Sequence, residues 1–352
     1  MSTPKFFVRK NVVFSAKRYG IDALSAMAQG LFASLLIGTI LCTIGDLSGI
    51  SIFNTAGNYA KAVAGPAMAI SIAFALQAPP LVMFSMLAVG QAANDLGGAG
   101  GPLAVLVIAI ISSECGKLVS GETKVDILVT PLVTIMVGAV LSYFLAPPIG
   151  TLAMDFGMLI NATTVLHPFL MGIIVSVLVG IALTLPISSA AICQAFAISG
   201  LAGGAAVAGC CAQMIGFAVI SFKENRWGGL VSQGLGTSML QMGNIVRNPR
   251  IWLPATLASA ITGPIATCIF HLEMNGPAIS SGMGTCGLVG QIGVYTGWLS
   301  DIAAGTKAAI TLMDWLGLVL ICFVLPAVFS LIFAKFFRKI GWIKDGDMKL
   351  DL

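Results

Sequence analysis

The sequence predicts an all-α, polytopic membrane protein with about ten transmembrane helices, some interrupted or folded into re-entrant hairpins. The chain is 57% hydrophobic and only 9% charged, whereas a soluble domain carries roughly a quarter charged residues. Residues 156–222 contain no Asp, Glu, Lys or Arg. That run must cross a membrane more than once, because one spanning helix needs about 20 apolar residues. Gly and Pro also interrupt the apolar sequence repeatedly.

The first apolar stretch follows a basic segment, residues 5–18, that resembles the start of a signal peptide. We expect it to be retained, because it is long enough to span and many further apolar segments follow. The expected spanning segments, in chain order, lie near 21–45, 60–78, 80–95, 101–118, 126–147, 167–186, 188–200 with 201–222, 251–270, 286–300 and 308–336.

Helix breaks inside the apolar sequence carry most of the functional information. They occur at LQAPP (76–80), NDLGGAGGP (94–102), LTLPISSAA (183–191), ISGLAGGAA (198–206) and HLEMNGPAISSGMGTCGLVGQI (271–292). Backbone groups freed at membrane depth are costly unless they are buried in protein or line a watery cavity. The breaks therefore predict half-helices of the kind that transporters use at their binding sites.

Basic residues set the expected orientation. Fourteen of the 18 fall in three blocks: residues 1–18; Lys223, Arg226, Arg247 and Arg250; and Lys335, Arg338, Lys339, Lys344 and Lys349. Loops rich in Lys and Arg stay in the cytoplasm. Both termini and the 223–250 connection are therefore expected on the cytoplasmic side.

We expect one membrane-embedded domain, residues 1–350, with an N-terminal half (1–148) and a C-terminal half (149–350) that carries the substrate site. Residues 228–246 are uncharged but flanked by basic residues. They are interpreted as an amphipathic or gating helix at the cytoplasmic surface, with 149–166 as a counterpart before the second half.

Glu273 is the first candidate site residue. A carboxylate at the bilayer centre costs about 2.5 kcal/mol or more, so it needs a partner, a proton or a cavity. Glu273 precedes the break at Asn275, Gly276 and Pro277, where its oxygens can face a cavity and accept hydrogen bonds from sugar hydroxyls. The alternative is a protonated Glu that ties two helices together.

His167 is the second candidate, as the only His in the charge-free run. It could donate to a substrate hydroxyl or to Glu273, although a lone His is more commonly a packing or interfacial residue. His271 is a secondary candidate.

Uncharged polar side chains gather at the same breaks. Small polar ligands are held by a few such groups within apolar walls, although each group alone is more often a bond between helices. The candidates chosen here for substrate binding are Gln77, Ser188, Ser189, Asn275, Thr285 and Gln291.

Several functions are disfavoured. The chain has no GxxxxGK[ST] phosphate-binding motif for ATP, no appended phosphocarrier module and no DNA-binding domain, so no catalytic residue, cofactor or nucleic-acid partner is expected. Its eight cysteines include no CxxC pair, and we expect them to pack as small apolar residues. With two histidines, a metal site is not expected.

Three stretches carry a resemblance: HPFLMGIIVSVLVGIALTLPISSAAI (167–192), NPRIWLP (248–254) and FHLEMNGPAISSGMGTCGLVGQIGV (270–294). The chain resembles the membrane-embedded IIC components of the bacterial phosphoenolpyruvate-dependent sugar phosphotransferase system. More closely, it resembles the stand-alone branch that includes the perfringolysin regulator-type proteins. Sugar-transporting relatives have a Glu motif closer to Asn-Glu-Pro, from which residues 273–277 depart.

The resemblance implies a homodimer in the bacterial inner (plasma) membrane, in which His167 and Glu273 hold the solute. Elevator-like movement would present the solute to the cytoplasm, where a separate phosphocarrier subunit would phosphorylate it. The leading hypothesis is therefore a sugar permease that works by alternating access. The alternatives are a phosphorylation-independent transporter of a small polar metabolite and a membrane sensor that regulates transcription through a partner.

Overall fold

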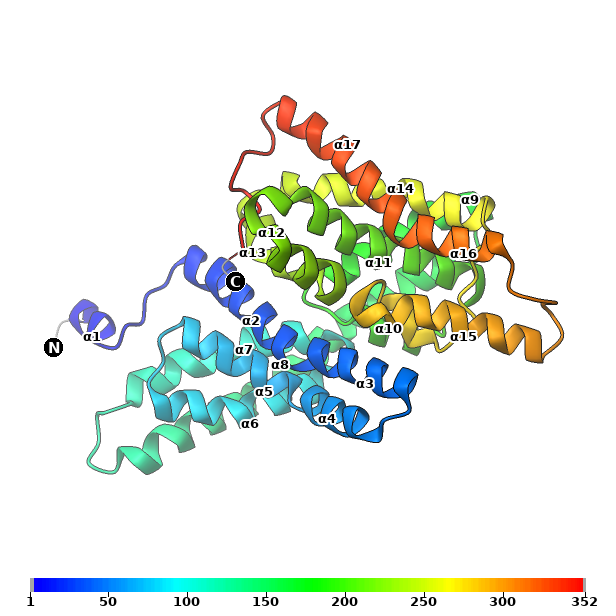
Figure 1. Cartoon of the computed structure of the whole chain (residues 1–352). Coiled ribbons are helices and arrows are strands. Elements are labelled where there is room, and N and C mark those ends of the chain that lie inside the picture. Colours follow the sequence, from blue (N-terminus) through cyan, green and yellow to red (C-terminus); the bar gives the residue numbers. More distant parts are fainter. Residues whose placement is uncertain (1–2, 351–352) are drawn as a thin grey trace. The chain divides into compact units, whose positions relative to one another are not determined.

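The computed structural model describes residues 3–350, and it is built from helices (Figure 1). The one strand-like pairing in this described range is an isolated antiparallel bridge between Gly200 and Met274. The chain divides into two compact units, residues 1–153 and 154–352. The expected all-α fold is confirmed.

The first unit begins with a short helix and continues as a series of longer ones. They are α1 (Thr3–Arg9), α2 (Ala23–Leu31), α3 (Ile37–Ser48), α4 (Ser51–Ala62), α5 (Ala64–Ala75), α6 (Pro80–Gly97), α7 (Gly101–Val119) and α8 (Asp126–Thr163), the last of which runs on into the second unit. π-Helical turns at Arg18–Asp22 and Phe32–Leu36 join onto α2 and α3 without a break.

Helices α6 and α7 form a hairpin. Gly98 turns the chain with a φ of +50°, which glycine adopts without a side-chain clash. A Cβ on Gly116, near the end of α7, would lie 3.0 Å from the Val82 side chain, near the start of α6. The two helices therefore run antiparallel, as the separate segments 80–95 and 101–118 predicted.

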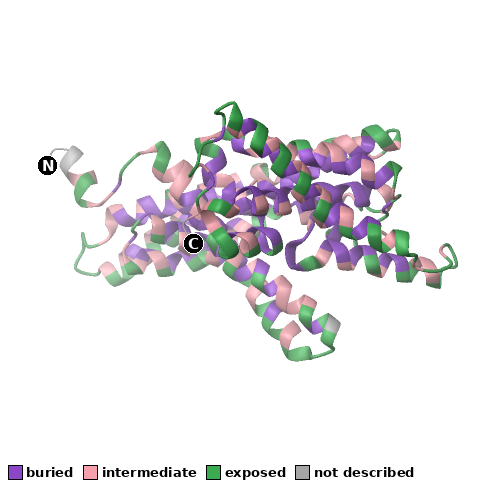
Figure 2. Cartoon of the chain, turned by 45° about the horizontal axis from the view of Figure 1, so that its top comes forward, coloured by how far each residue is buried: buried purple, intermediate pink, exposed green. Residues whose placement is uncertain are grey.

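The second unit contains the remaining helices. They are α9 (Pro168–Thr184), α10 (Ser189–Ala195), α11 (Gly200–Ile220), α12 (Phe222–Val231), α13 (Met242–Arg247), α14 (Leu253–Cys268), α15 (Val289–Ala303), α16 (Leu312–Val319) and α17 (Leu325–Lys339). A π-helical turn at Leu320–Val324 joins α16 to α17. In Figure 2 the buried residues run along the inward faces of the helices, and the loops at the outer ends of the helices are exposed.

Small residues allow α9, α11 and α14 to pack closely. A Cβ on Gly209 would overlap the backbone of Ser176, and one on Gly263 would overlap the carbonyl oxygen of Gly172. The hydroxyl of Ser176 donates to the carbonyl of Ser259 at 2.8 Å. Membrane helices associate through such small-residue contacts and interhelical hydrogen bonds, because lipid supplies no hydrophobic drive between them.

Six stretches of the described chain are long and apolar enough to cross a membrane, as expected of a polytopic protein. They are Arg18–Asp46, Pro80–Val119, Asp126–Thr163, Gly200–Ile220, Pro249–Cys268 and Leu312–Lys339, and Ala64–Ala75 and Pro168–Thr184 are shorter apolar helices. Pro80–Val119 contains the α6–α7 hairpin, so it represents two of the ten expected segments.

Two interpretations of the connecting segments were wrong. Residues 149–163 continue α8 through Pro147 and Pro148, because membrane helices tolerate proline where neighbours compensate. The 228–246 segment is not one surface helix. It comprises the end of α12, a π-helical turn, a 3₁₀ turn and most of α13, and its side chains Gln233, Gln241 and Asn244 are buried.

The segment 342–350 is held by amide side chains of α12 and of the 228–246 segment. Asn225 donates to the carbonyl of Met348 and accepts from the backbone N–H of Leu350, each at 2.8 Å. Gln241 donates to the same Met348 carbonyl at 3.0 Å, and Asn244 donates to that of Lys349 at 2.9 Å. Met348 is fully buried, so this segment is part of the core of the second unit.

Candidate functional site

The long break predicted around Glu273 is present. Helix α14 ends at Cys268, and regular helix resumes only at Val289, with short 3₁₀ turns at Ala278–Gly282 and Cys286–Leu288 between. His271 has a φ of +44°, which turns the chain away from the helix axis. An extended stretch that carries Glu273 follows.

This extended stretch is fixed against the start of α11. The backbone N–H of Gly200 donates to the carbonyl of Met274 at 3.0 Å, and that of Met274 donates to Gly200 at 2.9 Å. Gly204, one turn along α11, leaves room for the backbone of Leu272, because a Cβ there would overlap its carbonyl. The breaks predicted at 198–206 and 271–292 thus pair with each other.

A pocket of about 440 Å³ lies beside the extended stretch. It is bounded by the 270–275 stretch, the last turns of α15, the 304–311 loop and the start of α16. The polar groups that line it are His271, Glu273, Asn275, Asp301, Lys307 and Asp314.

Asn275 organises the carboxylates of the pocket. Its Nδ2 donates to Glu273 Oε2 at 3.1 Å and to Asp301 Oδ2 at 2.9 Å, so one amide holds two acidic side chains on one wall. Glu273 is exposed, and Asn275 and Asp301 are half-buried. The remaining carboxylate oxygens are therefore left to accept hydrogen bonds from a solute.

The opposite wall carries an ion pair. Lys307 Nζ lies 2.8 Å from Asp314 Oδ1, and Asp314 Oδ2 accepts from the backbone and the hydroxyl of Thr311 at 2.7 and 2.8 Å, in a capping box that starts α16. Glu273 and Asp301 form no ion pair within residues 3–350. The pocket therefore holds three carboxyl groups against one ammonium group.

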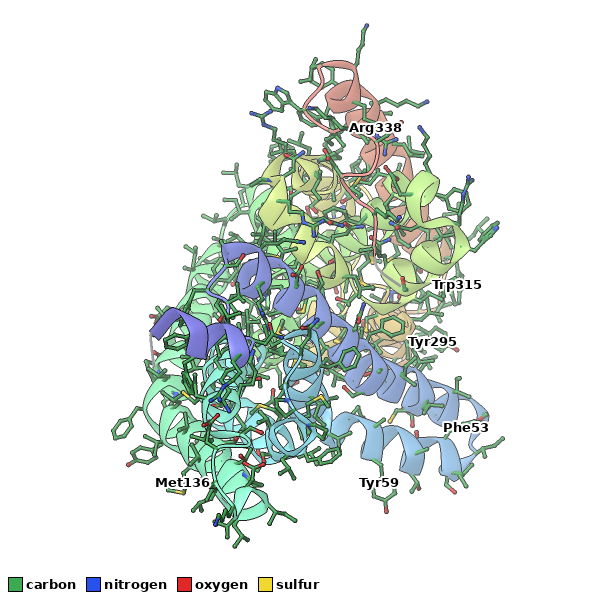
Figure 3. All side chains as sticks on the ribbon, turned by 90° about the vertical axis from the view of Figure 1, so that its left-hand side faces the viewer. Phe53, Tyr59, Met136, Tyr295, Trp315 and Arg338 are labelled. Carbon is green, nitrogen blue, oxygen red and sulfur yellow. The ribbon has the colours of Figure 1, made fainter. Side chains whose placement is uncertain are left out.

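Aromatic side chains complete the pocket. Trp298 lines it and is 4% exposed, with Lys307 Nζ 5.9 Å from its ring centre. Trp315 packs edge-on against Trp298 at 5.5 Å, and Tyr295 packs against Trp315 at 5.8 Å. Figure 3 labels Tyr295 on α15 and Trp315 on α16, which come together at this end of the unit. The pocket thus combines carboxylates, an amide and an indole wall.

Four of the other predicted residues have structural contacts next to the breaks, and none of them lines the pocket. Ser188 caps α10 by accepting from the backbone N–H of Ala191 at 3.2 Å, and Ser189 donates to the carbonyl of Gly282 at 2.7 Å. Thr285 donates to the Met214 sulfur at 3.4 Å. Gln291 donates to the Cys211 sulfur at 3.3 Å, and its buried Oε1 has no partner among the described residues.

His167 and Gln77 lie outside the pocket. His167 is exposed and immediately precedes α9. Thr267, at the end of α14, donates to the carbonyl of Pro168 at 2.9 Å. His167 therefore lies near the end of α14, where the extended stretch that carries Glu273 begins. Gln77 belongs to the first unit, where its Oε1 accepts from Asn11 at 2.7 Å.

Sequence reasoning missed Trp298, Asp301 and Lys307. A usable signal was present, because Trp298 and Asp301 are three residues apart in an apolar helix, and residues at that spacing share a face. Asp314 was not among the predicted substrate-binding residues either.

The fold and the pocket define a class: a polytopic membrane protein with a polar pocket beside broken helices. The chain belongs to the family described as Phosphotransferase system, EIIC, whose family model matches residues 21–350. It is thus a membrane component of a sugar phosphotransferase system. No curated protein and no solved structure matches the chain.

Proposed function

We propose that this protein binds a sugar in the pocket around Glu273 and Asn275 and carries it across the membrane by alternating access. The family model supports a sugar transport component. The observation that favours this pocket is the pair of carboxylates held by one amide beside an indole ring. Carboxylate and amide oxygens accept hydrogen bonds from sugar hydroxyls, and an indole face covers the apolar face of a sugar ring.

The position of the pocket supports an outward-facing site. Asp314, at the pocket, and Arg338 lie near opposite ends of the Leu312–Lys339 span, roughly 36 Å apart along the helix at 1.5 Å per residue. That exceeds the hydrocarbon thickness of about 30 Å. Basic residues mark the Arg338 end, where Lys223 also pairs with Asp345 at 2.5 Å. Under the positive-inside rule this end is cytoplasmic, so the pocket opens on the outer side.

The charge of the pocket restricts the class of sugar. Three carboxyl groups against one ammonium group disfavour an acidic sugar, because like charges in a partly desolvated site repel. Neutral sugars and amino sugars fit better. His167, Ser188, Ser189, Thr285 and Gln291 are proposed to contact the substrate in a state in which the 271–288 stretch has moved.

A panel of neutral sugars, amino sugars and sugar acids, titrated against purified protein by thermal shift and tryptophan fluorescence, tests the proposal. A ligand at 100 times its dissociation constant stabilises by about 2.7 kcal/mol. We expect a neutral or amino sugar to bind, and Glu273→Gln and Asn275→Ala to abolish the response. The matched control is Glu122→Gln, which removes a carboxylate of the first unit.

A sugar response that both pocket variants retain would place the site elsewhere. Uptake into proteoliposomes, with and without the phosphocarrier subunits, then separates the mechanisms. Phosphorylated product in the lumen supports the phosphotransferase mechanism, and accumulation of unmodified sugar supports a phosphorylation-independent transporter. The proposed homodimer is tested on the same preparation by its mass in detergent. A sensor is supported only by binding without uptake.

A further inference from the structure

The first unit contains a second pocket, of about 390 Å³, that shares no lining residue with the Glu273 pocket. It lies where α5 ends, α6 begins and α7 ends. Its polar lining includes Arg9, Lys10, Asn11, Gln77, Lys117 and Glu122.

The base of this pocket is a rigid polar assembly. Lys117 is 1% exposed and donates to the carbonyls of Asn11 at 2.9 Å and Leu76 at 3.0 Å, while its Nζ also lies 2.7 Å from Glu114. Arg18 donates to the same Leu76 carbonyl at 2.5 Å and to Asn11 Oδ1 at 3.2 Å. The basic segment before the first span is thereby bonded to the helix break at 76–80.

The rim of the pocket carries accessible positive charge. Arg9 and Lys10 both pair with Glu122, and the Arg9 side chain is 52% exposed. Across the assembly, the four basic side chains Arg9, Lys10, Arg18 and Lys117 face three acidic side chains, Glu114, Glu122 and Asp126. The excess of basic groups favours an anionic ligand.

The pocket also lies at the edge of the apolar layer. Three candidate spans have an end beside it, at Arg18, at Pro80 with Val119, and at Asp126. Apolar side chains around it are strongly exposed, with Val8 75%, Phe14 78% and Phe74 73%. Arg9 and Lys10 lie 5.4 and 5.8 Å from the ring centre of Phe6. Aromatic and basic side chains together are typical of the boundary between lipid and water.

We propose that this pocket binds the phosphate group of an anionic phospholipid of the cytoplasmic leaflet. Arg9 and Lys10 contact the phosphate oxygens, Asn11 and Gln77 face the polar part of the headgroup, and the acyl chains lie along the exposed apolar side chains. Basic pockets at the cytoplasmic ends of membrane helices bind lipid headgroups in this way. Because the acyl chains of the bilayer cover those apolar side chains, phospholipid headgroups lie beside the pocket at high local concentration, which favours the lipid over a soluble phosphate.

The test compares lipids on the purified full-length protein. Phosphatidylglycerol and phosphatidylcholine with identical acyl chains are titrated into detergent-solubilised protein, with thermal shift and native mass spectrometry as readouts. The test variant is Arg9→Gln/Lys10→Gln. The control variant, Arg247→Gln/Lys339→Gln, removes the same charge outside the pocket, at two residues that are exposed. Inorganic phosphate forms a separate arm.

We expect phosphatidylglycerol to stabilise the wild type and the control variant more than phosphatidylcholine does, and to form a retained adduct. In Arg9→Gln/Lys10→Gln the half-saturating concentration should rise by about tenfold or more. An unchanged response in that variant would refute the site, and equal stabilisation by inorganic phosphate would refute the lipid as ligand. If the variant does not fold, the wild type still tests the proposal. Its preference for phosphatidylglycerol should disappear at about 1 M salt, where charges are screened within about 3 Å, and a preference that persists would overturn the proposal.

Discussion

The contact between α11 and the Glu273 stretch leads to a direct prediction for Gly204→Ala. The added Cβ would overlap the carbonyl oxygen of Leu272 and lie 2.7 Å from its carbonyl carbon, about 0.7 Å inside ordinary van der Waals contact. Because the obstacle is backbone on both sides, no side-chain rotation relieves it. Overpacking of this kind typically costs about 1–3 kcal/mol.

The strain should move the neighbouring Glu273 and Asn275 out of their present geometry. We expect Gly204→Ala to lower the thermal stability and to weaken sugar binding by about tenfold or more, the equivalent of 1.4 kcal/mol. Thermal unfolding in detergent and the sugar titration measure the two effects. The control is Gly228→Ala, whose Cβ would meet nothing within 4 Å and should leave both values unchanged or raise stability slightly. If Gly204→Ala matches this control in thermal stability and in sugar affinity, the Glu273 stretch is not fixed by α11 and the reasoning fails.

Three further predictions concern other contacts. Asn225→Ala removes two hydrogen bonds to the 342–350 segment, each worth about 0.5–1.5 kcal/mol. This variant should speed proteolysis of that segment. The control Asn161→Ala, at an exposed position, should leave the rate of proteolysis unchanged. Lys307→Met leaves Asp314 without its ion-pair partner. In competition binding assays, the preference for amino sugars over neutral sugars should therefore increase. An unchanged preference would argue that the charge of the pocket does not select the sugar. The hydrogen bond from Lys10, helped by the charge of Arg9, holds the pKa of Glu122 below its ordinary value of 4.5, so this contact stabilises the fold above that value and is lost as the pH falls through the lowered pKa. Wild type and Glu122→Gln should therefore differ in thermal stability near neutral pH, and the difference should shrink as the pH falls below 4.5. A difference that does not change with pH would contradict this assignment.

The fold was largely predictable because its signals are local. Apolar length identifies the spans, and Gly and Pro mark where helices end. The breaks at 76–80 and 271–288 follow from those residues alone. The course of residues 228–246 could not be predicted, because a run of uncharged polar residues indicates a surface and a buried hydrogen-bonded network equally well.

The candidate site was predictable only in part. Glu273 and Asn275 were accessible to reasoning because they are polar groups beside a break in apolar sequence. Asp301 and Lys307 join them only through the return of α15 and the loop after it, a contact that spacing along the chain does not reveal. Ser189 and Gln291 show the reverse error, since a polar side chain in a break can serve to bond one backbone segment to another.

The 342–350 segment has a consequence for biosynthesis. Until Met348 has left the ribosome, the buried amide of Gln241 lacks the carbonyl to which it donates at 3.0 Å, and Asn244 lacks that of Lys349. Chains grow at about 5–20 residues per second, so the second unit enters the bilayer seconds before its polar network can close. A chain that terminates early would therefore leave each of these amides short of one hydrogen-bond partner at this end of the second unit. Membrane proteases could distinguish it from a finished molecule by that difference.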